Sequence, residues 1–139
     1  MLPDPTTPFG QRVRRRLQDE RVVWLTSVGQ DGTPQPNPVW FWWDGGSFLV
    51  YNRPDAGRVA HVRSRPAVSL SFDGDGRGGD IVVVLGRAEL SPGEPPAHDV
   101  PEYLAKYREQ MVRVSGSAEA FSRSYPTAMR VHPLRVRGH

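Results

Sequence analysis

Cysteine and long apolar runs are both missing from this chain of 139 residues. Without cysteine, disulfide bonds, thiolate metal sites and cysteine nucleophiles are excluded. No apolar run approaches the roughly 18 residues that a membrane-spanning helix needs. The first residues also lack the basic and apolar regions of a secretory signal peptide. We therefore expect a cytoplasmic protein without a membrane partner.

Lysine is nearly absent as well. Lys106 is the single lysine, so the other 17 of the 18 basic residues are arginines, and with 15 acidic residues the formal net charge is +3. Four arginines crowd the first predicted helix: Arg12, Arg14, Arg15 and Arg16. No aromatic residues alternate with them and no second basic block follows, so we interpret them as a solvated helix face and expect no nucleic-acid partner.

Motifs of hydrolytic and metal-dependent enzymes are missing too. The four histidines share no ligand spacing, and neither HExxH nor GxSxG occurs, so we predict no metal site and no serine nucleophile. The loop 73–80 begins like a calcium loop, but Arg77 and Val84 occupy two of the ligand positions. Its GxGxxG pattern runs into a predicted strand and not a helix, so we interpret it as a hairpin loop. No catalytic residue can be named from these patterns.

Glycine and proline are abundant, at 14 residues each, which predicts many turns and short strands. We expect a flexible leader over residues 1–7 and a single domain over residues 8–139. Hydrophobic periodicity predicts helices over 8–20, 55–64, 103–114 and 118–123, and strands over 22–28, 33–43, 48–52, 68–72, 81–90 and 129–136. Gly86 predicts a bulge in one strand. The expected fold is mainly β with flanking helices, a small antiparallel barrel of six strands.

The predicted strand 33–43 has an unusual composition. Prolines occupy every second position at its start: Pro34, Pro36 and Pro38. The three missing amide donors all point to one side, so the segment should be an edge strand or line an opening. The following residues are apolar on both faces, which indicates burial on two sides, and a partner subunit could cover one of these sides. Two interpretations are open for Trp40, Phe41 and Trp42: they pack in the core of a dimer, or they form an apolar wall for a ligand.

A candidate anion site lies between the strand 48–52 and the next helix. Asn52, Arg53 and Arg58 converge there with a helix N-terminus, whose free amides attract negative charge. Arginine adds bidentate donors that suit phosphate. The alternative interpretation is that Asn52 and Asp55 are helix caps and that both arginines are surface charges.

Several motifs together resemble a known family. These are the segments 23–27 (VWLTS), 31–35 (DGTPQ), 38–41 (PVWF), 51–55 (YNRPD), 65–68 (RPAV), 86–90 (GRAEL) and 130–138 (RVHPLRVRG). The chain resembles the split β-barrel flavin and deazaflavin oxidoreductases of the pyridoxamine 5′-phosphate oxidase-like superfamily, and most closely their coenzyme F420-dependent branch. The resemblance extends over residues 8–138.

The resemblance implies a homodimer with the cofactor in a groove between subunits. It implies three sets of cofactor-binding residues: Trp24, Leu25, Thr26 and Ser27 along the ring, Asn52, Arg53, Pro54, Gly57 and Arg58 at the phosphate, and Gly79, Asp80, Ile81 and Val82 from the opposite strand or subunit. Arg58 stands at the family's phosphate-binding lysine, and Asn52 where serine or threonine is more usual. The implied activity is hydride transfer from reduced coenzyme F420 to a small organic acceptor. The alternatives are an FMN-dependent oxidoreductase and a non-enzymatic flavin or heme binder.

Overall fold

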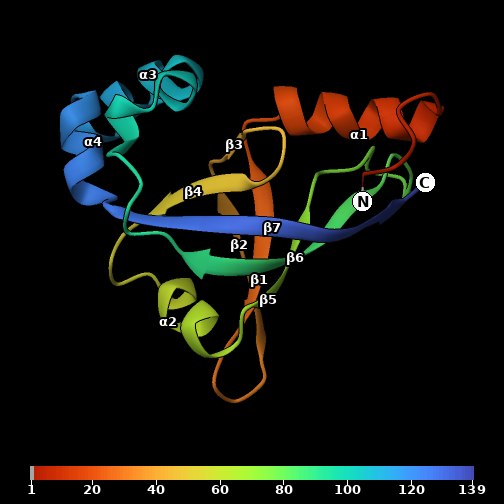
Figure 1. Ribbon diagram of the computed structural model, residues 1–139, viewed down its shortest axis with the longest axis horizontal. Helices are drawn as coiled ribbons and strands as arrows, with labels where there is room; N and C mark the ends of the chain where they lie inside the picture. Colours follow the sequence, from red (N-terminus) through yellow and green to blue (C-terminus); the bar gives the residue numbers. More distant parts are fainter. Residues whose placement is uncertain (1) are drawn as a thin grey trace.

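The computed structural model describes residues 2–139, which form one curled sheet with helices around it (Figure 1). Met1, the first residue of the predicted leader, lies outside the described residues. The elements in chain order are α1 (Pro8–Asp19), β1 (Val23–Val28), β2 (Pro34–Val39), β3 (Trp42–Trp43), β4 (Phe48–Asn52), α2 (Gly57–Ser64), β5 (Ala67–Ser71), β6 (Val82–Leu90), the 3-10 turn η1 (Ala97–Asp99), α3 (Pro101–Ser115), α4 (Ala118–Ser124) and β7 (Thr127–Gly138).

The sheet is antiparallel, with the strand order β2-β1-β5-β6-β7-β4-β3. The two edge strands, β2 and β3, are neighbours in the chain with only Trp40 and Phe41 between them. The sheet must therefore curl until its two edges meet at this connection, which gives a split barrel. The prediction of a mainly β split barrel is confirmed, but its six strands are wrong by one. Seven strands form because the predicted strand 33–43 divides into β2 and β3.

The division of that strand has a long-range cause. At Phe41 the amide donates to the Tyr107 hydroxyl (2.9 Å), and the carbonyl accepts from Lys106 Nζ (2.8 Å) and from the same hydroxyl (3.0 Å). The Tyr107 hydroxyl also lies 2.6 Å from the carbonyl of Arg21. These side chains of α3 satisfy the backbone where the chain leaves one edge of the sheet for the other.

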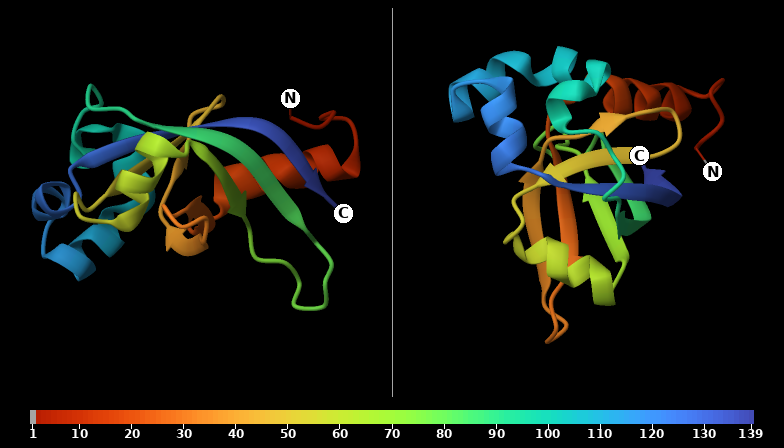
Figure 2. Two further views of the ribbon diagram at one scale, coloured as in Figure 1. Left: turned by 90° about the horizontal axis from the view of Figure 1, so that it is seen from below. Right: turned by 60° about the vertical axis from the view of Figure 1, so that its left-hand side comes forward.

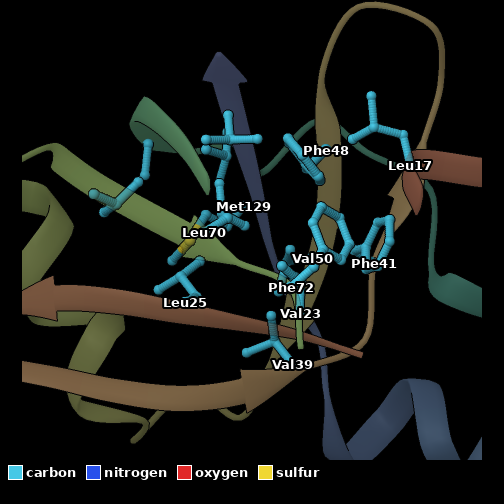
Figure 3. Close-up of a cluster of buried hydrophobic side chains, with 14 of the residues drawn as sticks. Leu17, Val23, Leu25, Val39, Phe41, Phe48, Val50, Leu70, Phe72 and Met129 are labelled. Atoms are coloured by element: carbon cyan, nitrogen blue, oxygen red, sulfur yellow. The ribbon is translucent and has the colours of Figure 1, made fainter. Parts of the chain in front are cut away.

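Two apolar clusters fill the interior. The first lies inside the curled sheet and includes the side chains of Leu17, Val23, Leu25, Val39, Phe41, Phe48, Val50, Leu70, Phe72 and Met129 (Figure 3). The second lies between the sheet and α3–α4, where Tyr103, Tyr107, Met111 and Phe121 pack with Trp40 and Trp42. The segment after β2 is thus covered on two sides as predicted, and helices of the same chain supply the second cover, while Trp40 and Trp42 stay partly exposed.

Two local predictions are confirmed. The proline-rich β2 lies at an edge of the sheet. The ladder between β6 and β7 shifts register between Leu85 and Gly86, the expected bulge. A Cβ on Gly86 would approach the carbonyl oxygen of His132 to 2.9 Å, which is why this position has no side chain.

The helices sit at the ends of the curled sheet. Figure 1 and the right-hand view of Figure 2 show α1 near one end, α2 near the other, and α3 and α4 together at one side. Thr7 caps α1 through its hydroxyl, 3.0 Å from the amide of Gly10, with Pro8 in the first turn as expected. Within residues 2–139 every helix is too short or too polar to cross a membrane.

Candidate functional site

The predicted anion site forms a defined corner between β4 and α2. Asn52 ends β4 with a fully buried side chain, and its amide donates to the carbonyl of Thr127 (2.9 Å) and more weakly to that of Val50 (3.3 Å). Its Oδ1 accepts from Nε of Arg58, at 2.6 Å. The buried side chain of Asn52 therefore holds the guanidinium of Arg58 in one orientation.

This corner has more donors than acceptors. Arg58 is half-buried, and among residues 2–139 it forms no ion pair with a carboxylate. Burial lowers the pKa of Arg58, as expected for a cation without a counter-charge. Ala56 precedes α2 without a side-chain cap, and the amides of Gly57 and Arg58 have no acceptor within the described part of the chain. A free guanidinium and free amides at a helix N-terminus together suit a phosphate group.

A cavity of about 200 Å³ opens beside Arg58, between the β2–β3 connection and α3–α4. It is lined by Pro38, Val39, Trp40, Tyr51, Arg58, Tyr103, Val114, Phe121 and Tyr125. The indole of Trp40 is stacked between the rings of Tyr107 and Phe121, with centroid distances of 4.7 Å and 5.2 Å. The wall is therefore largely aromatic, and among its lining residues the one charged group is Arg58.

One polar atom of this wall lacks a partner. Tyr103 is fully buried, and its hydroxyl has no hydrogen-bond partner anywhere in residues 2–139. Burial raises the pKa of Tyr103, so the hydroxyl stays protonated and acts as a donor. By contrast, the hydroxyl of Tyr51 on the same wall donates to the carbonyl of Pro95 at 2.6 Å. An unsatisfied buried hydroxyl is costly, and a ligand acceptor in the cavity would remove this cost.

The four residues predicted along the ring lie on β1, where side chains alternate between two faces. Leu25 and Ser27 are fully buried in the interior, so only their main-chain atoms could reach a ligand. Trp24, which is 40% exposed, and Thr26 point to the outer face of the sheet. Trp24 pairs with Pro38, which lines the cavity, so this face continues to the corner.

The other residues predicted at the phosphate also gather at the corner. Arg53 lies over the ring of Tyr125, with its guanidinium carbon 5.0 Å from the centroid. Pro54 is exposed in the turn, and Gly57 opens α2. The structure thus brings Asn52, Arg58 and the start of α2 together as the sequence predicted.

The third predicted set lies elsewhere in the single chain. Gly79, Asp80, Ile81 and Val82 lead into β6, where Val82 pairs with Gly138 at the end of β7, whereas Asn52 pairs with Thr127 at its start. From 127 to 138 is 11 residues, about 36 Å of strand. Asp80, at φ 56°, forms ion pairs with Arg12 (3.0 Å) and Arg16 of α1. This segment cannot reach the corner of its own chain.

The cavity wall from α3 and α4 was not predicted. The spacing of Tyr103, Tyr107 and Met111 indicates one buried helix face. This spacing does not predict that the hydroxyl of Tyr107 forms hydrogen bonds while that of Tyr103 forms none in the described chain. Phe121 was predicted only to lie on the short helix 118–123, and Tyr125 lay outside every predicted element.

Comparisons with known proteins agree with this fold. A family model described as pyridoxamine 5′-phosphate oxidase matches residues 9–139. A solved structure named F420 reductase is 22% identical, covers 88% of this chain and 94% of its own, and has a TM-score of 0.69. A conserved hypothetical protein, Rv2991, from Mycobacterium tuberculosis is 20% identical, with 91% and 81% covered and a TM-score of 0.70. HutZ, a heme storage protein from Vibrio cholerae, is 13% identical, with 92% of each chain covered and a TM-score of 0.66. No curated protein matches in sequence.

Proposed function

The chain belongs to the pyridoxamine 5′-phosphate oxidase family, and on this premise we propose that it is an oxidoreductase that binds coenzyme F420 and directs hydride transfer to a small organic acceptor. The observation that carries the proposal is the surplus of donors at the β4–α2 corner, beside an aromatic cavity. The deazaflavin supplies the hydride chemistry when it is bound, and the protein supplies binding, orientation and exclusion of water.

The residues of the corner fit a phosphate-bearing cofactor. Arg58, aimed by Asn52, and the amides of Gly57 and Arg58 would hold the phosphate. The unpaired hydroxyl of Tyr103 would donate to a carbonyl or an anionic oxygen in the cavity. None of these groups is an acid–base pair, which agrees with a reaction whose chemistry resides in the cofactor.

A second copy of the chain would complete the site. The cavity of about 200 Å³ is smaller than the roughly 300–1,000 Å³ of ordinary small-molecule sites. On the outer face of the sheet, Trp24, Val83 and Leu85 are incompletely covered. A homodimer through this face would cover them, and the segment 79–82 of the second copy could then close the groove that it cannot reach in its own chain.

The test is a titration of the purified protein with oxidised coenzyme F420 and with FMN, followed by tryptophan fluorescence, because Trp24 and Trp40 flank the proposed groove. We expect quenching by coenzyme F420, and oxidation of reduced coenzyme F420 when acceptors are added. Submicromolar binding of FMN without binding of coenzyme F420 would replace the proposal by an FMN-dependent oxidoreductase. Binding of heme alone would replace it by a non-enzymatic role.

A further inference from the structure

A buried serine fixes the orientation of a histidine beside the proposed phosphate site. The hydroxyl of Ser27 lies 2.8 Å from Nδ1 of His61 on α2. Ser27 is fully buried, and its hydroxyl has no other partner among residues 2–139. The proton of this buried hydroxyl has no other acceptor, so the arrangement favours donation from Ser27 to Nδ1 of His61. This direction of the bond corresponds to the tautomer with the ring proton on the opposite nitrogen, Nε2.

That second nitrogen lies at the first turn of α2. A Cβ placed on Gly57 would be 3.7 Å from His61 Nε2, and a Cβ on Gly29 would be equally close, at 3.7 Å. A side chain at Gly29 or Gly57 would therefore be in van der Waals contact with this nitrogen. His61 Nε2 has no hydrogen-bond acceptor in the described chain, and the amides of Gly57 and Arg58 next to it are also without one.

The neighbouring hairpin does not supply the missing acceptor. Asp31 is the carboxylate nearest to Gly29, but its Oδ1 accepts from the amide of Thr33 at 3.0 Å. The side chain of Gln35 lies near both glycines and brings a neutral amide. The first turn of α2 thus has two amides and an imidazole nitrogen without a hydrogen-bond partner in the described chain, and the side chain of Arg58 starts from the same turn. The acceptor oxygen Oε1 of Gln35 lies 4.0 Å from the Cβ position of Gly57 and bonds to none of these groups.

We propose that His61 is a further phosphate-binding residue, which donates through Nε2, and that Ser27 is the residue that positions it. This inference rests on the proposed function, because it assigns His61 to the phosphate of the same cofactor. A phosphate monoester or diester has several acceptor oxygens, so Arg58, His61 and the amides of α2 can each donate to a different one. Ser27 would then act from inside the barrel, which explains a polar side chain at a fully buried position of β1.

The experiment compares ligands with and without the phosphate: FMN against riboflavin, and coenzyme F420 against its phosphate-free deazaflavin chromophore. The ratio of the two affinities is measured for the wild type, His61→Ala, His61→Gln and Ser27→Ala. A hydrogen bond to a charged group predicts that His61→Ala lowers the preference for the phosphate form by roughly 10- to 100-fold. Glutamine, whose amide nitrogen reaches the position of Nε2, should restore most of it.

Ser27→Ala separates orientation from folding. The free protein should show the Nε2–H tautomer of His61 by ¹⁵N NMR, and Ser27→Ala should show a mixture of tautomers with a several-fold lower preference for phosphate. An Nδ1–H tautomer in the wild type, or an unchanged affinity ratio in His61→Ala, would overturn the inference. If Arg58→Ala loses the preference while His61→Ala keeps it, the proposed function stands and the role of His61 does not. Equal affinity of the wild type for both forms of each ligand would remove the phosphate site itself.

Discussion

Tyr103 and Tyr107 are neighbours with opposite hydrogen bonding, and their removal should have opposite effects on stability. Both side chains are fully buried, and their ring centroids are 4.9 Å apart. The hydroxyl of Tyr107 connects the amide and carbonyl of Phe41 with the carbonyl of Arg21, whereas that of Tyr103 has no partner in residues 2–139. We expect Tyr107→Phe to destabilise the protein and Tyr103→Phe to be neutral or stabilising.

The magnitudes follow from the atoms that each substitution leaves behind. In Tyr107→Phe the amide of Phe41 becomes a buried donor without a partner, which costs about 1–3 kcal/mol. The bond that the hydroxyl proton makes adds about 0.5–1.5 kcal/mol, while Lys106 Nζ still serves the carbonyl of Phe41 at 2.8 Å. The total is about 1.5–4.5 kcal/mol. Tyr103→Phe removes a desolvated hydroxyl and no bond, so it should change stability by about 0 to 2 kcal/mol in the favourable direction.

Urea unfolding of the three proteins, followed by tryptophan fluorescence, measures both changes. The two variants lose the same atom from the same kind of residue, so each is the control for the other. Binding should be affected in the other variant. We expect Tyr103→Phe to weaken binding of coenzyme F420, because this substitution removes the free hydroxyl donor in the cavity. If Tyr103→Phe destabilised the fold as much as Tyr107→Phe, the hydroxyl would have a partner and the argument for a ligand at this atom would fail.

Three further predictions concern the anion corner, an ion pair and the outer face. Arg58→Ala should weaken binding of coenzyme F420 by about 1.5–3 kcal/mol in calorimetry with the fold retained, and Arg58→Lys should recover part of the loss; unchanged affinity would remove Arg58 from the site. The hydrogen bond from Arg130 holds the pKa of Glu94 below its usual value of 4.5, so this pair should stabilise the fold above about pH 4.5 and lose that contribution as the pH falls further. Urea unfolding at pH 7 and at about pH 3.5 should show a smaller acid loss for Glu94→Gln, and an equal loss in both proteins would contradict this. Leu85→Arg on the outer face should yield a monomer in sedimentation and weaken cofactor binding; a wild type that is already monomeric would exclude the proposed dimer.

The sequence predicts a strand best when the residues that determine its position lie within the strand itself. The prolines of β2 lack amide donors wherever they occur, so their edge position can be inferred from spacing alone. The break between β2 and β3 could not be inferred, because Lys106 and Tyr107 hold Phe41 from positions 65 and 66 residues away. Apolar periodicity continues through the break and gives no sign of it.

The candidate site likewise has one part that the sequence predicts and another that it does not. Asn52 and Arg58 are six residues apart, and a strand that ends where a helix begins brings them to a distance of 2.6 Å. The aromatic wall depends on how α3 and α4 fold back over the sheet, which their own periodicity does not specify. Ser27 illustrates a further limit: the family resemblance suggests that it lines the ring, but the alternation along β1 turns its side chain inward to His61.

The prolines of β2 also limit how this protein can assemble. In an antiparallel strand the amide and carbonyl of one residue point to the same side, so the outer rim of β2 offers carbonyls at Pro34, Pro36 and Pro38 and no N–H between them. A strand from another chain could not form a regular ladder on such a rim, which protects against edge-to-edge aggregation. A second copy is therefore not expected to add at this edge, which agrees with the proposed association through the face of the sheet, where Trp24 is exposed.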